Sequence, residues 1–209
     1  MNMERRFVWQ DVKTAYREAR PSKHGEELRW VVNQETIMNT ETGQTVTRGT
    51  IRHPGVCVIV PFLDSETVVL MHQYRYAANR ALWEVPAGTL AARLENGRVL
   101  ATESPEACAA RELLEETGYR AAELEKICEC YAMPGSSDEL MHVFFARDLE
   151  RHEQELDLGE IIEEVRPFRL AEVDAMILRR EIRDAKTLVG LFYALRIGKS
   201  SAEIRPAAP

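Results

Sequence analysis

Short apolar runs separated by turn residues make up most of this chain. The strongest run, residues 56–63, is eight residues long and is followed by a polar turn at 64–66 and a second apolar stretch at 67–76. Two such runs predict a β-hairpin over residues 55–76, with its first strand buried. The same pattern predicts further strands at 28–36, 45–53, 82–85, 124–131, 140–147 and 161–170.

Helix signals are clearest near the middle of the chain. Ser104 and Pro105 are typical of a helix start and Gly118 of a helix end, which predicts a helix over residues 104–116. Two later helices are expected at 171–180 and 185–197. The last of them places four apolar residues on one face, namely Leu188, Leu191, Phe192 and Leu195.

Two segments are harder to assign. Residues 4–20 have a weak helical spacing, and residues 89–102 are expected to be irregular, with Asn96-Gly97 as a turn pair. The order of elements is strands, helix, strands, helices. This order favours an α+β sandwich in which helices cover a mixed sheet.

The composition permits one globular domain of ordinary size, with room for a small appendage. Of the 209 residues, 45% are hydrophobic and 29% charged, so a buried core is possible. The longest apolar run contains Pro61 and is too short to cross a bilayer, and no apolar signal segment follows Met1. We therefore expect a cytoplasmic protein with no membrane partner.

The charge balance argues against a nucleic-acid partner. Lys and Arg number 27 and Asp and Glu number 34, which gives a formal net charge of −7. An acidic chain repels nucleic-acid phosphates unless it carries a dense basic stripe, and none is present. The four cysteines, at 57, 108, 128 and 130, lack redox or zinc-site spacing and are expected to be buried free thiols.

Three acidic residues in the first predicted helix are candidates for metal binding. Glu112, Glu115 and Glu116 are related by i, i+3 and i+4, so their carboxylates emerge on one side of a helix. Like charges on one face repel, but a divalent cation between them would stabilise the arrangement. Arg111 is placed to hold one carboxylate by a bidentate contact. The alternative is an ordinary solvated helix edge.

The surroundings of this cluster resemble the Nudix signature, G-x5-E-x7-R-E-U-x-E-E-x-G-U, where U is a bulky apolar residue. The positions that match at the required spacing are Gly97, Glu103, Arg111, Glu112, Leu113, Glu115, Glu116 and Gly118. The final position is Tyr119, which is bulky but not aliphatic. Agreement at so many fixed offsets is far more specific than a single short motif.

The first glycine of the signature has two candidates. In relatives that cleave ADP-ribose, this glycine usually closes a strand of the form E-x-P-A-G, which here spans residues 84–88. We favour Gly88 as the equivalent glycine. Gly97 then matches by accident, and residues 89–102 contain an insertion.

Further runs resemble the subgroup that cleaves ADP-sugars. These are Gln73-Tyr74-Arg75-Tyr76, Pro134 at sixteen residues after Gly118, and Ile182-Arg183-Asp184-Ala185-Lys186-Thr187. The resemblance implies a Nudix fold, an α/β/α sandwich with a mixed sheet, over residues 51–209. It also implies that residues 1–50 form a small sheet that helps to build a homodimer.

The resemblance assigns the metal site. Glu112, Glu115 and Glu116 are expected to bind Mg²⁺, or Mn²⁺, with the backbone carbonyl of Ala87 as a further ligand. Oxygen ligands suit both ions. Arg111 and Glu115 are also expected to serve catalysis. Glu103 is expected to brace the loop or Arg111 rather than to bind metal.

The base and the substrate contacts follow from the same resemblance. The general base that activates water is expected on a late acidic loop, at Glu163 first and Glu160 second, with Glu164 nearby. Substrate contacts are expected from Arg75 near the diphosphate, Arg48 at the adenine end, Glu84 and a stacking Trp30. Either arginine can equally be a surface residue, and Trp30 a packing residue.

The resulting hypothesis is Mg²⁺-dependent hydrolysis of ADP-ribose, or a related nucleoside diphosphate sugar, to AMP and ribose 5-phosphate. One alternative is another Nudix pyrophosphohydrolase acting on NADH, a dinucleoside polyphosphate, a GDP-sugar or an oxidised nucleotide. A second is a nucleotide-sensing Nudix module without catalysis, although such a module would be expected to lose catalytic glutamates. An isomerase on this fold ranks below both.

Overall fold

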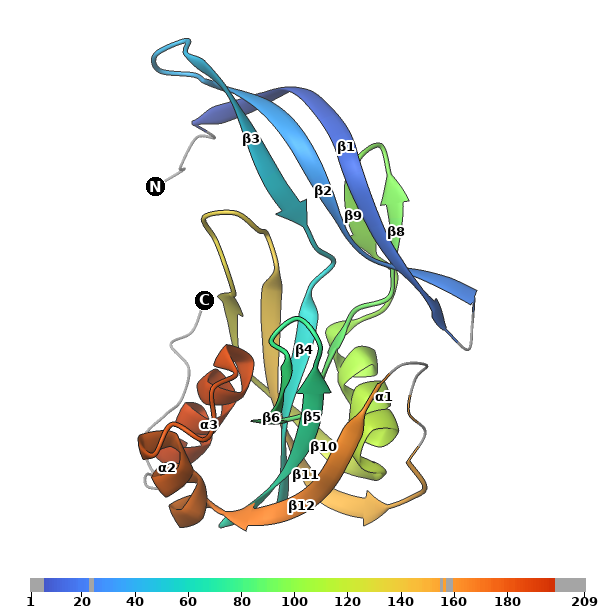
Figure 1. The fold of residues 1–209 in the computed structure, drawn as a ribbon, viewed down its shortest axis with the longest axis vertical. Helices are drawn as coiled ribbons and strands as arrows, with labels where there is room; N and C mark the ends of the chain where they lie inside the picture. Colours follow the sequence, from blue (N-terminus) through green and yellow to red (C-terminus); the bar gives the residue numbers. More distant parts are fainter. Residues whose placement is uncertain (1–5, 23–24, 155, 157–159, 198–209) are drawn as a thin grey trace. The chain divides into compact units, whose positions relative to one another are not determined.

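The computed structural model describes residues 6–22, 25–154, 156 and 160–197. The chain forms two compact units (Figure 1). Unit 1 comprises Met1–Gly55, Thr89–Glu103 and Tyr131–Leu140. Unit 2 comprises Val56–Gly88, Ser104–Cys130 and Met141–Pro209.

The described part of unit 1 is built around strands. A three-stranded antiparallel sheet contains β1 (Phe7–Ser22), β2 (Gly25–Asn39) and β3 (Thr45–Arg52) in that order. A separate antiparallel hairpin is formed by β8 (Ala92–Glu95) and β9 (Arg98–Ala101). Nδ2 of Asn33 donates a hydrogen bond to the carbonyl oxygen of Gly97 at 2.9 Å, which ties the hairpin to β2.

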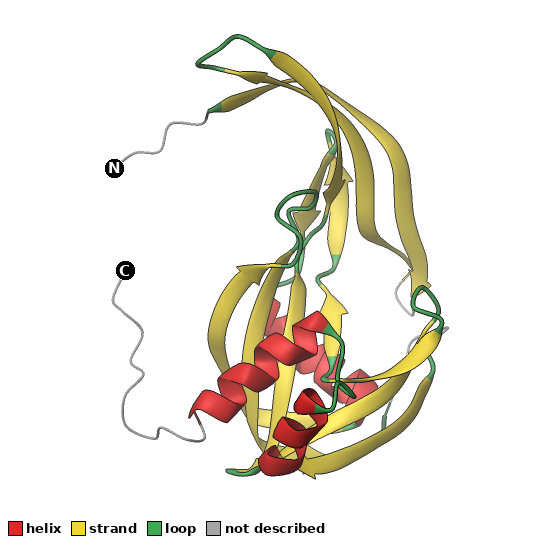
Figure 2. Ribbon diagram, turned by 60° about the vertical axis from the view of Figure 1, so that its left-hand side comes forward, coloured by secondary structure: helices red, strands yellow, loops and turns green. Residues whose placement is uncertain are grey.

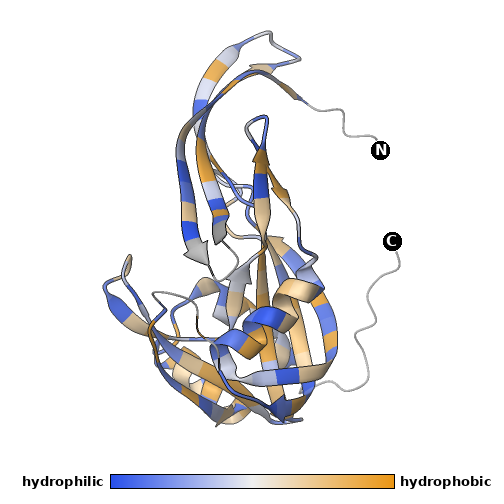
Figure 3. Ribbon diagram, turned by 90° about the vertical axis from the view of Figure 1, so that its right-hand side faces the viewer, coloured by the Kyte–Doolittle hydropathy of each residue, from blue (hydrophilic) through white to orange (hydrophobic). Residues whose placement is uncertain are grey.

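The helical spacing of residues 4–20 predicts the wrong element, because β1 occupies this segment from Phe7 onward; residues 4 and 5 lie outside the described residues. Its pairing with β2 shifts register at three places, between Trp9 and Asp11, Thr14 and Tyr16, and Glu18 and Ala19. The first two shifts leave one extra residue each on β1, and the third leaves one on β2. An extra residue changes which face the following side chains of its strand occupy. The alternation of polar and apolar residues along β1 is therefore interrupted. Figure 3 shows hydrophilic and hydrophobic residues mixed along the strands.

Residues 89–102 are not irregular, since most of them form the β8–β9 hairpin. Asn96 and Gly97 connect its strands with φ angles of 50° and 74°. Two consecutive positive φ angles characterise a type I′ turn, for which Asn-Gly is the preferred sequence. The predicted turn at Asn96-Gly97 is confirmed, whereas the sequence pattern does not predict β8 and β9 on either side of it.

A charged network links the strands of unit 1. Arg52 of β3 donates from Nε and Nη2 to the two carboxylate oxygens of Glu35 at 2.7 and 2.5 Å, and from Nη1 to Asp138 at 3.0 Å. Nε1 of Trp9 donates to Glu35 at 2.9 Å. Burial alone would raise the pKa of Glu35, but hydrogen bonds from Arg52 and Trp9 lower it below its ordinary value.

Unit 2 contains a mixed sheet. Its strands are β4 (Val56–Asp64), β5 (Thr67–Arg75), β6 (Arg80–Glu84), β7 (Ala87–Thr89), β10 (Tyr119–Tyr131), β11 (Leu140–Arg151) and β12 (Ile162–Arg169). The order is β10-β11-β4-β5-β12, with β6 paired to β5 and β7 to β4. β11 and β4 are parallel, whereas β5 is antiparallel to β4, β6 and β12. The mixed sheet and the hairpin over residues 55–76 are both confirmed.

Three helices belong to unit 2: α1 (Pro105–Thr117), α2 (Leu170–Leu178) and α3 (Ala185–Ile197) (Figure 2). Their positions agree with the predicted helices to within two residues at each end. Within the described ranges, no helix combines the length and the apolar character that crossing a membrane requires.

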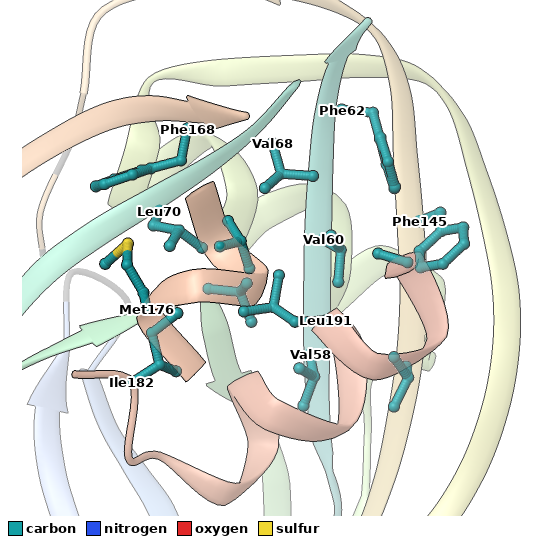
Figure 4. Packing of buried hydrophobic residues seen from close by; sticks show 14 of the residues in the cluster. Val58, Val60, Phe62, Val68, Leu70, Phe145, Phe168, Met176, Ile182 and Leu191 are labelled. Atoms are coloured by element: carbon teal, nitrogen blue, oxygen red, sulfur yellow. The ribbon is translucent and has the colours of Figure 1, made fainter. Parts of the chain in front are cut away.

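The central strand β4 is buried on both faces, and its side chains alternate between two helical layers. Val58 and Val60 belong to the apolar cluster that contains Leu191 of α3 (Figure 4). The intervening face carries Cys57, whose sulfur lies 2.9 Å from that of Cys108 on α1. The helices α1 and α3 therefore cover opposite faces of β4. This is the expected α/β/α arrangement.

Close packing explains why α3 lies directly on β4. A Cβ atom at Gly190 would lie 2.7 Å from Cγ2 of Val60, so glycine permits the close approach. Leu191, the next residue, is fully buried. Burial of a leucine side chain contributes roughly 1.5–3 kcal/mol, which makes this contact a main support of the sandwich.

Candidate active site

Both ends of α1 are held by local hydrogen bonds. Oγ of Ser104 accepts a hydrogen bond from the backbone N–H of Ala107 at 3.1 Å, and Pro105 begins the helix. At the other end Gly118 has a φ of 71°, and its N–H donates to the carbonyl of Leu114 at 2.8 Å. These caps define where the helix begins and ends. With its register set, Glu112 and Glu116 are buried and Glu115 is half-buried.

A single guanidinium nitrogen joins two of the glutamates. Nη1 of Arg111 donates to Glu112 at 2.8 Å and to Glu115 at 3.0 Å. The side chains of these two glutamates are only 8% and 16% exposed. Arg111 therefore bridges two carboxylates, where the sequence suggested a bidentate contact to one. The bridge reduces the repulsion between them and keeps both on the same side of α1.

Glu116 points from α1 toward the start of β7. One of its carboxylate oxygens accepts a hydrogen bond from the backbone N–H of Ala87 at 2.8 Å, and the residue is 1% exposed. Burial raises the pKa of Glu116 well above its ordinary value, and the charges of Glu112 and Glu160 raise it further. The cluster thus carries more negative charge than its surroundings compensate.

Gly88 packs directly against the side chain of Glu112. A Cβ atom built on Gly88 would be 1.8 Å from Oε1 of Glu112, so only glycine leaves room for this carboxylate. Gly97 lies in the β8–β9 turn of unit 1. These positions favour Gly88 as the signature glycine, as the sequence comparison of the two candidates did.

Two thiols contact the backbone of Gly88. The carbonyl oxygen of Gly88 lies 3.4 Å from Sγ of Cys57 and 3.6 Å from Sγ of Cys108. Burial raises the pKa of Cys57 well above its usual range, so its thiol stays neutral. All four cysteines are free, but only these two are buried, whereas Cys128 and Cys130 are partly exposed.

Arg75 and Glu84 form a bidentate ion pair across β5 and β6. Nε and Nη2 of Arg75 donate to the two oxygens of Glu84 at 3.0 and 2.6 Å. Burial alone would lower the pKa of Arg75, but Glu84 and the more distant Glu116 and Asp184 raise it. Arg75 is therefore a permanently charged group within electrostatic range of Glu116.

The two expected candidates for the base have different surroundings. Glu163 lies 2.9 Å from Nδ1 of His72, and the ring of His72 packs on Trp83 with centroids 4.7 Å apart. Glu160 is close enough to Glu116 to raise the pKa of that carboxyl. Glu164 pairs instead with Arg166 at 3.5 Å, on an exposed part of β12.

Four other predicted residues lie in unit 1. One oxygen of Glu103 accepts a hydrogen bond from the N–H of Ala91 at 3.1 Å, so it braces the loop. Gly97 forms the hairpin turn. Arg48 is exposed on β3. Trp30 is half-buried, with its ring 5.5 Å from that of Tyr16, a contact that fits the packing alternative.

The donor set of α1 fits a hard divalent cation. Glu116 and Glu112 both contact the Ala87–Gly88 backbone, and Arg111 joins Glu112 to Glu115. Burial and, after it, the charges of Glu112 and Glu160 raise the pKa of Glu116, and a cation would offset the effect of those charges. Across the described residues, no three His, Cys, Asp or Glu side chains are already arranged as a complete ligand group. Arg111 instead occupies the position between Glu112 and Glu115.

Sequence reasoning missed the role of two residues at the start of α3, the half-buried Asp184 just before the helix and the buried Thr187 in its first turn. Thr187 is fully buried and accepts a hydrogen bond at Oγ1 from the backbone N–H of Val85 at 3.0 Å. Asp184 in turn accepts from Thr187. The Asp-x-x-Thr spacing is typical of a helix N-cap and could have identified this pair as capping residues. Their contact with Val85 depends on tertiary structure.

Comparison with known proteins identifies the family of the chain. A family model described as NUDIX domain matches residues 51–189. The ADP-ribose pyrophosphatase of Bacillus subtilis (strain 168) is 37% identical over 153 residues, which cover 72% of this chain and 77% of the relative. The GDP-mannose pyrophosphatase of Citrobacter koseri is 34% identical over 152 residues, which cover 68% of this chain and 73% of that relative.

A solved structure described as an ADP compounds hydrolase matches the fold. Its TM-score is 0.72 at 19% sequence identity, and the match covers 98% of this chain and 100% of that chain. The family model, the sequence relatives and the shared fold lead to one conclusion. The chain belongs to the Nudix family.

Proposed function

We propose that this protein is a Nudix hydrolase that cleaves the diphosphate of ADP-ribose to give AMP and ribose 5-phosphate. The observation that carries the proposal is the arrangement of Glu112 and Glu116 of α1 against Ala87 and Gly88. It is supported by the identity with an ADP-ribose pyrophosphatase over most of the chain. The GDP-mannose pyrophosphatase relative has slightly lower identity, and a GDP-sugar is therefore the second candidate substrate.

The carboxylates Glu112, Glu115 and Glu116 would hold Mg²⁺ or Mn²⁺, with the carbonyl of Ala87 as a further candidate ligand. When bound, such a cation supplies positive charge for the phosphate oxygens and lowers the pKa of a water molecule. Glu116 is positioned for this role by the N–H of Ala87, and Glu112 by the space above Gly88. Arg111 holds Glu112 and Glu115 on the same side of the helix.

Arg75 is the proposed contact for the substrate diphosphate. Glu84 fixes the guanidinium plane through two hydrogen bonds. A guanidinium has five N–H donors, so Arg75 can hold Glu84 and a phosphate oxygen at once. Arg48 and Trp30 remain proposals for the adenine end of the substrate.

Product analysis tests the proposed reaction. Incubation with ADP-ribose and Mg²⁺ is expected to release AMP and ribose 5-phosphate in equal amounts, measured by chromatography with mass detection. EDTA should stop the reaction, and added Mg²⁺ or Mn²⁺ should restore it. A higher kcat/KM for GDP-mannose, NADH, a dinucleoside polyphosphate or an oxidised nucleotide would replace ADP-ribose as the substrate. Binding of ADP-ribose without products would support a sensing module.

Two glutamine substitutions test the base. The electrostatic effect of Glu160 on Glu116 supports Glu160 as the base. Glu160→Gln is expected to lower kcat by roughly 10²–10⁴-fold, as for loss of a general base, and Glu163→Gln by less than about tenfold. Steady-state kinetics at saturating Mg²⁺ would compare them. The opposite order would return the role to Glu163, the residue that the sequence favoured.

The N-terminal segment, residues 1–50, is proposed to help form a homodimer. The support is a row of apolar side chains on one face of β1 that are 39–47% exposed, namely Phe7, Trp9 and Val12. Exposed apolar groups gathered on one strand are typical of a surface that another chain covers. Light scattering coupled to gel filtration is expected to give twice the chain mass of 23.9 kDa. The monomer mass at micromolar concentration would refute the proposal.

A further inference from the structure

A hydrogen-bonded polar pair lies at the start of α3, made of the half-buried Asp184 and the buried Thr187. Asp184 is the residue before the helix, and one of its carboxylate oxygens accepts hydrogen bonds from both the backbone N–H and Oγ1 of Thr187, each at 2.8 Å. The other oxygen accepts from Nζ of Lys186 at 2.8 Å. The backbone bond alone is an ordinary helix cap. The hydroxyl bond has a further consequence, because it commits the single hydroxyl proton of Thr187 to Asp184.

With its proton directed at Asp184, the Thr187 hydroxyl can only accept from its other neighbours. Its partner is the backbone N–H of Val85, at 3.0 Å and 102 residues away in sequence. Burial alone would raise the pKa of Asp184, but Lys186 and the Thr187 hydrogen bonds lower it, so the carboxylate stays ionised. A charged acceptor at one end polarises the hydroxyl and strengthens its bond to Val85.

Val85 lies in the short segment that separates β6 from β7, outside either strand. Pro86 has no N–H to donate, and its carbonyl accepts a hydrogen bond from Ile59 of β4 at 2.9 Å. The next N–H, that of Ala87, holds Glu116 at 2.8 Å. Three consecutive residues are therefore attached to three different elements of unit 2: α3, β4 and α1.

We propose that Thr187, oriented by Asp184, is a positioning residue for the reaction of the Glu116 site. It anchors Val85 from α3, and thereby sets where Ala87 presents its N–H to Glu116 and where Gly88 leaves space for Glu112. Thr187 touches neither carboxylate and acts only through the backbone of residues 85–88. The kinetic test of this inference rests on the proposed hydrolase function. Metal binding gives a second test that does not depend on that function.

The matched pair of variants is Thr187→Val and Thr187→Ser. Valine keeps the shape of the side chain and removes the hydroxyl, whereas serine keeps the hydroxyl. Thr187→Val is expected to lower kcat by about 10–100-fold and to raise the Kd for Mn²⁺ by about tenfold, as for loss of a group that orients metal ligands. Thr187→Ser is expected to stay within about threefold of the wild type in both, because its hydroxyl can make the same bonds.

A second control separates positioning from general loss of stability. Leu191→Ala opens a cavity in the core beside the same helix and leaves Thr187 unchanged. It should lower the melting temperature at least as much as Thr187→Val, yet leave kcat and the Mn²⁺ Kd near those of the wild type. Mn²⁺ affinity would be measured by electron paramagnetic resonance on the protein without nucleotide.

The outcomes distinguish the two proposals. If the wild type cleaves ADP-ribose and Thr187→Val matches it in kcat and in Mn²⁺ affinity, the positioning role is refuted and the hydrolase stands. It is also refuted if Thr187→Ser is as impaired as Thr187→Val, or if Leu191→Ala loses as much metal affinity. If the wild type does not cleave ADP-ribose, the proposed function fails, and the Mn²⁺ affinities alone decide the role of Thr187.

Discussion

Glu116→Gln is expected to remove most of the activity while leaving the fold intact. The change deletes a negative charge that the proposed metal site requires but keeps an oxygen that can accept the Ala87 N–H. We expect kcat to fall by roughly 10²–10⁴-fold, which corresponds to about 3–5 kcal/mol of transition-state stabilisation. The Kd for Mn²⁺ should rise in parallel, because a neutral amide is a poorer ligand for a hard cation.

Without metal, Glu116→Gln is not expected to lower the stability of the protein, in contrast to its effect on activity. Burial and the neighbouring carboxylates raise the pKa of Glu116, which means that the folded state disfavours its ionised form. A group whose folded pKa lies above its unfolded pKa reduces stability at pH values above both, so a neutral residue at this position relieves that penalty. The melting temperature of Glu116→Gln without metal is therefore expected to equal or exceed that of the wild type.

Two comparisons make this result specific. Glu112→Gln should lose activity to a similar extent, since it alters the same cluster. Glu106→Gln, an exposed change in the first turn of the same helix, should match the wild type in kcat and metal affinity. Near-normal turnover in both Glu112→Gln and Glu116→Gln would show that the acidic face of α1 is not the metal site.

The second large effect is expected from Gly88→Ala. The added Cβ would lie 1.8 Å from Oε1 of Glu112, so the carboxylate must move away. The obstructing atoms are the end of a flexible side chain, and its rotation costs the fold little. Displacement of a reacting group by about 1 Å can cost about 10²-fold in rate, so we expect kcat to fall by at least that factor.

Measurements of kcat, Mn²⁺ affinity and melting temperature would separate an effect on the site from an effect on the fold. We expect large losses in kcat and in Mn²⁺ affinity and a small change in melting temperature. Gly135→Ala is the matched control, because a Cβ there meets nothing within 4 Å. If Gly88→Ala turned over ADP-ribose like the wild type, the present position of the Glu112 carboxylate would not matter for catalysis.

The parts of the site that the sequence predicts are those encoded by neighbouring residues. Ser104, Pro105 and Gly118 mark the ends of α1 through hydrogen bonds within a few residues, so its limits were predictable. The i, i+3 and i+4 spacing of the three glutamates follows from helix geometry alone. The buried strand β4 was predictable because an uninterrupted apolar run needs a covered position on both faces.

Other features depended on partners far along the chain. The pattern of residues 4–20 predicts a helix because two extra residues on β1 interrupt the alternation that identifies strands. The β8–β9 hairpin was missed because two four-residue strands carry little signal without the turn and sheet that support them. Local pattern cannot reveal a strand whose stability comes mainly from its pairing.

By itself, the sequence determined the catalytic helix, the acidic face of that helix and the Nudix family, because each depends on residues that lie a few positions apart in the chain. Tertiary structure decided which glycine lies beneath Glu112, that Arg111 bridges two carboxylates, and that Thr187 holds the backbone before Ala87. These contacts join α1, α3 and the segment after β6, which are up to 102 residues apart. Their distances arise only when the core packs, since packing brings these elements together and no local propensity specifies how closely they meet.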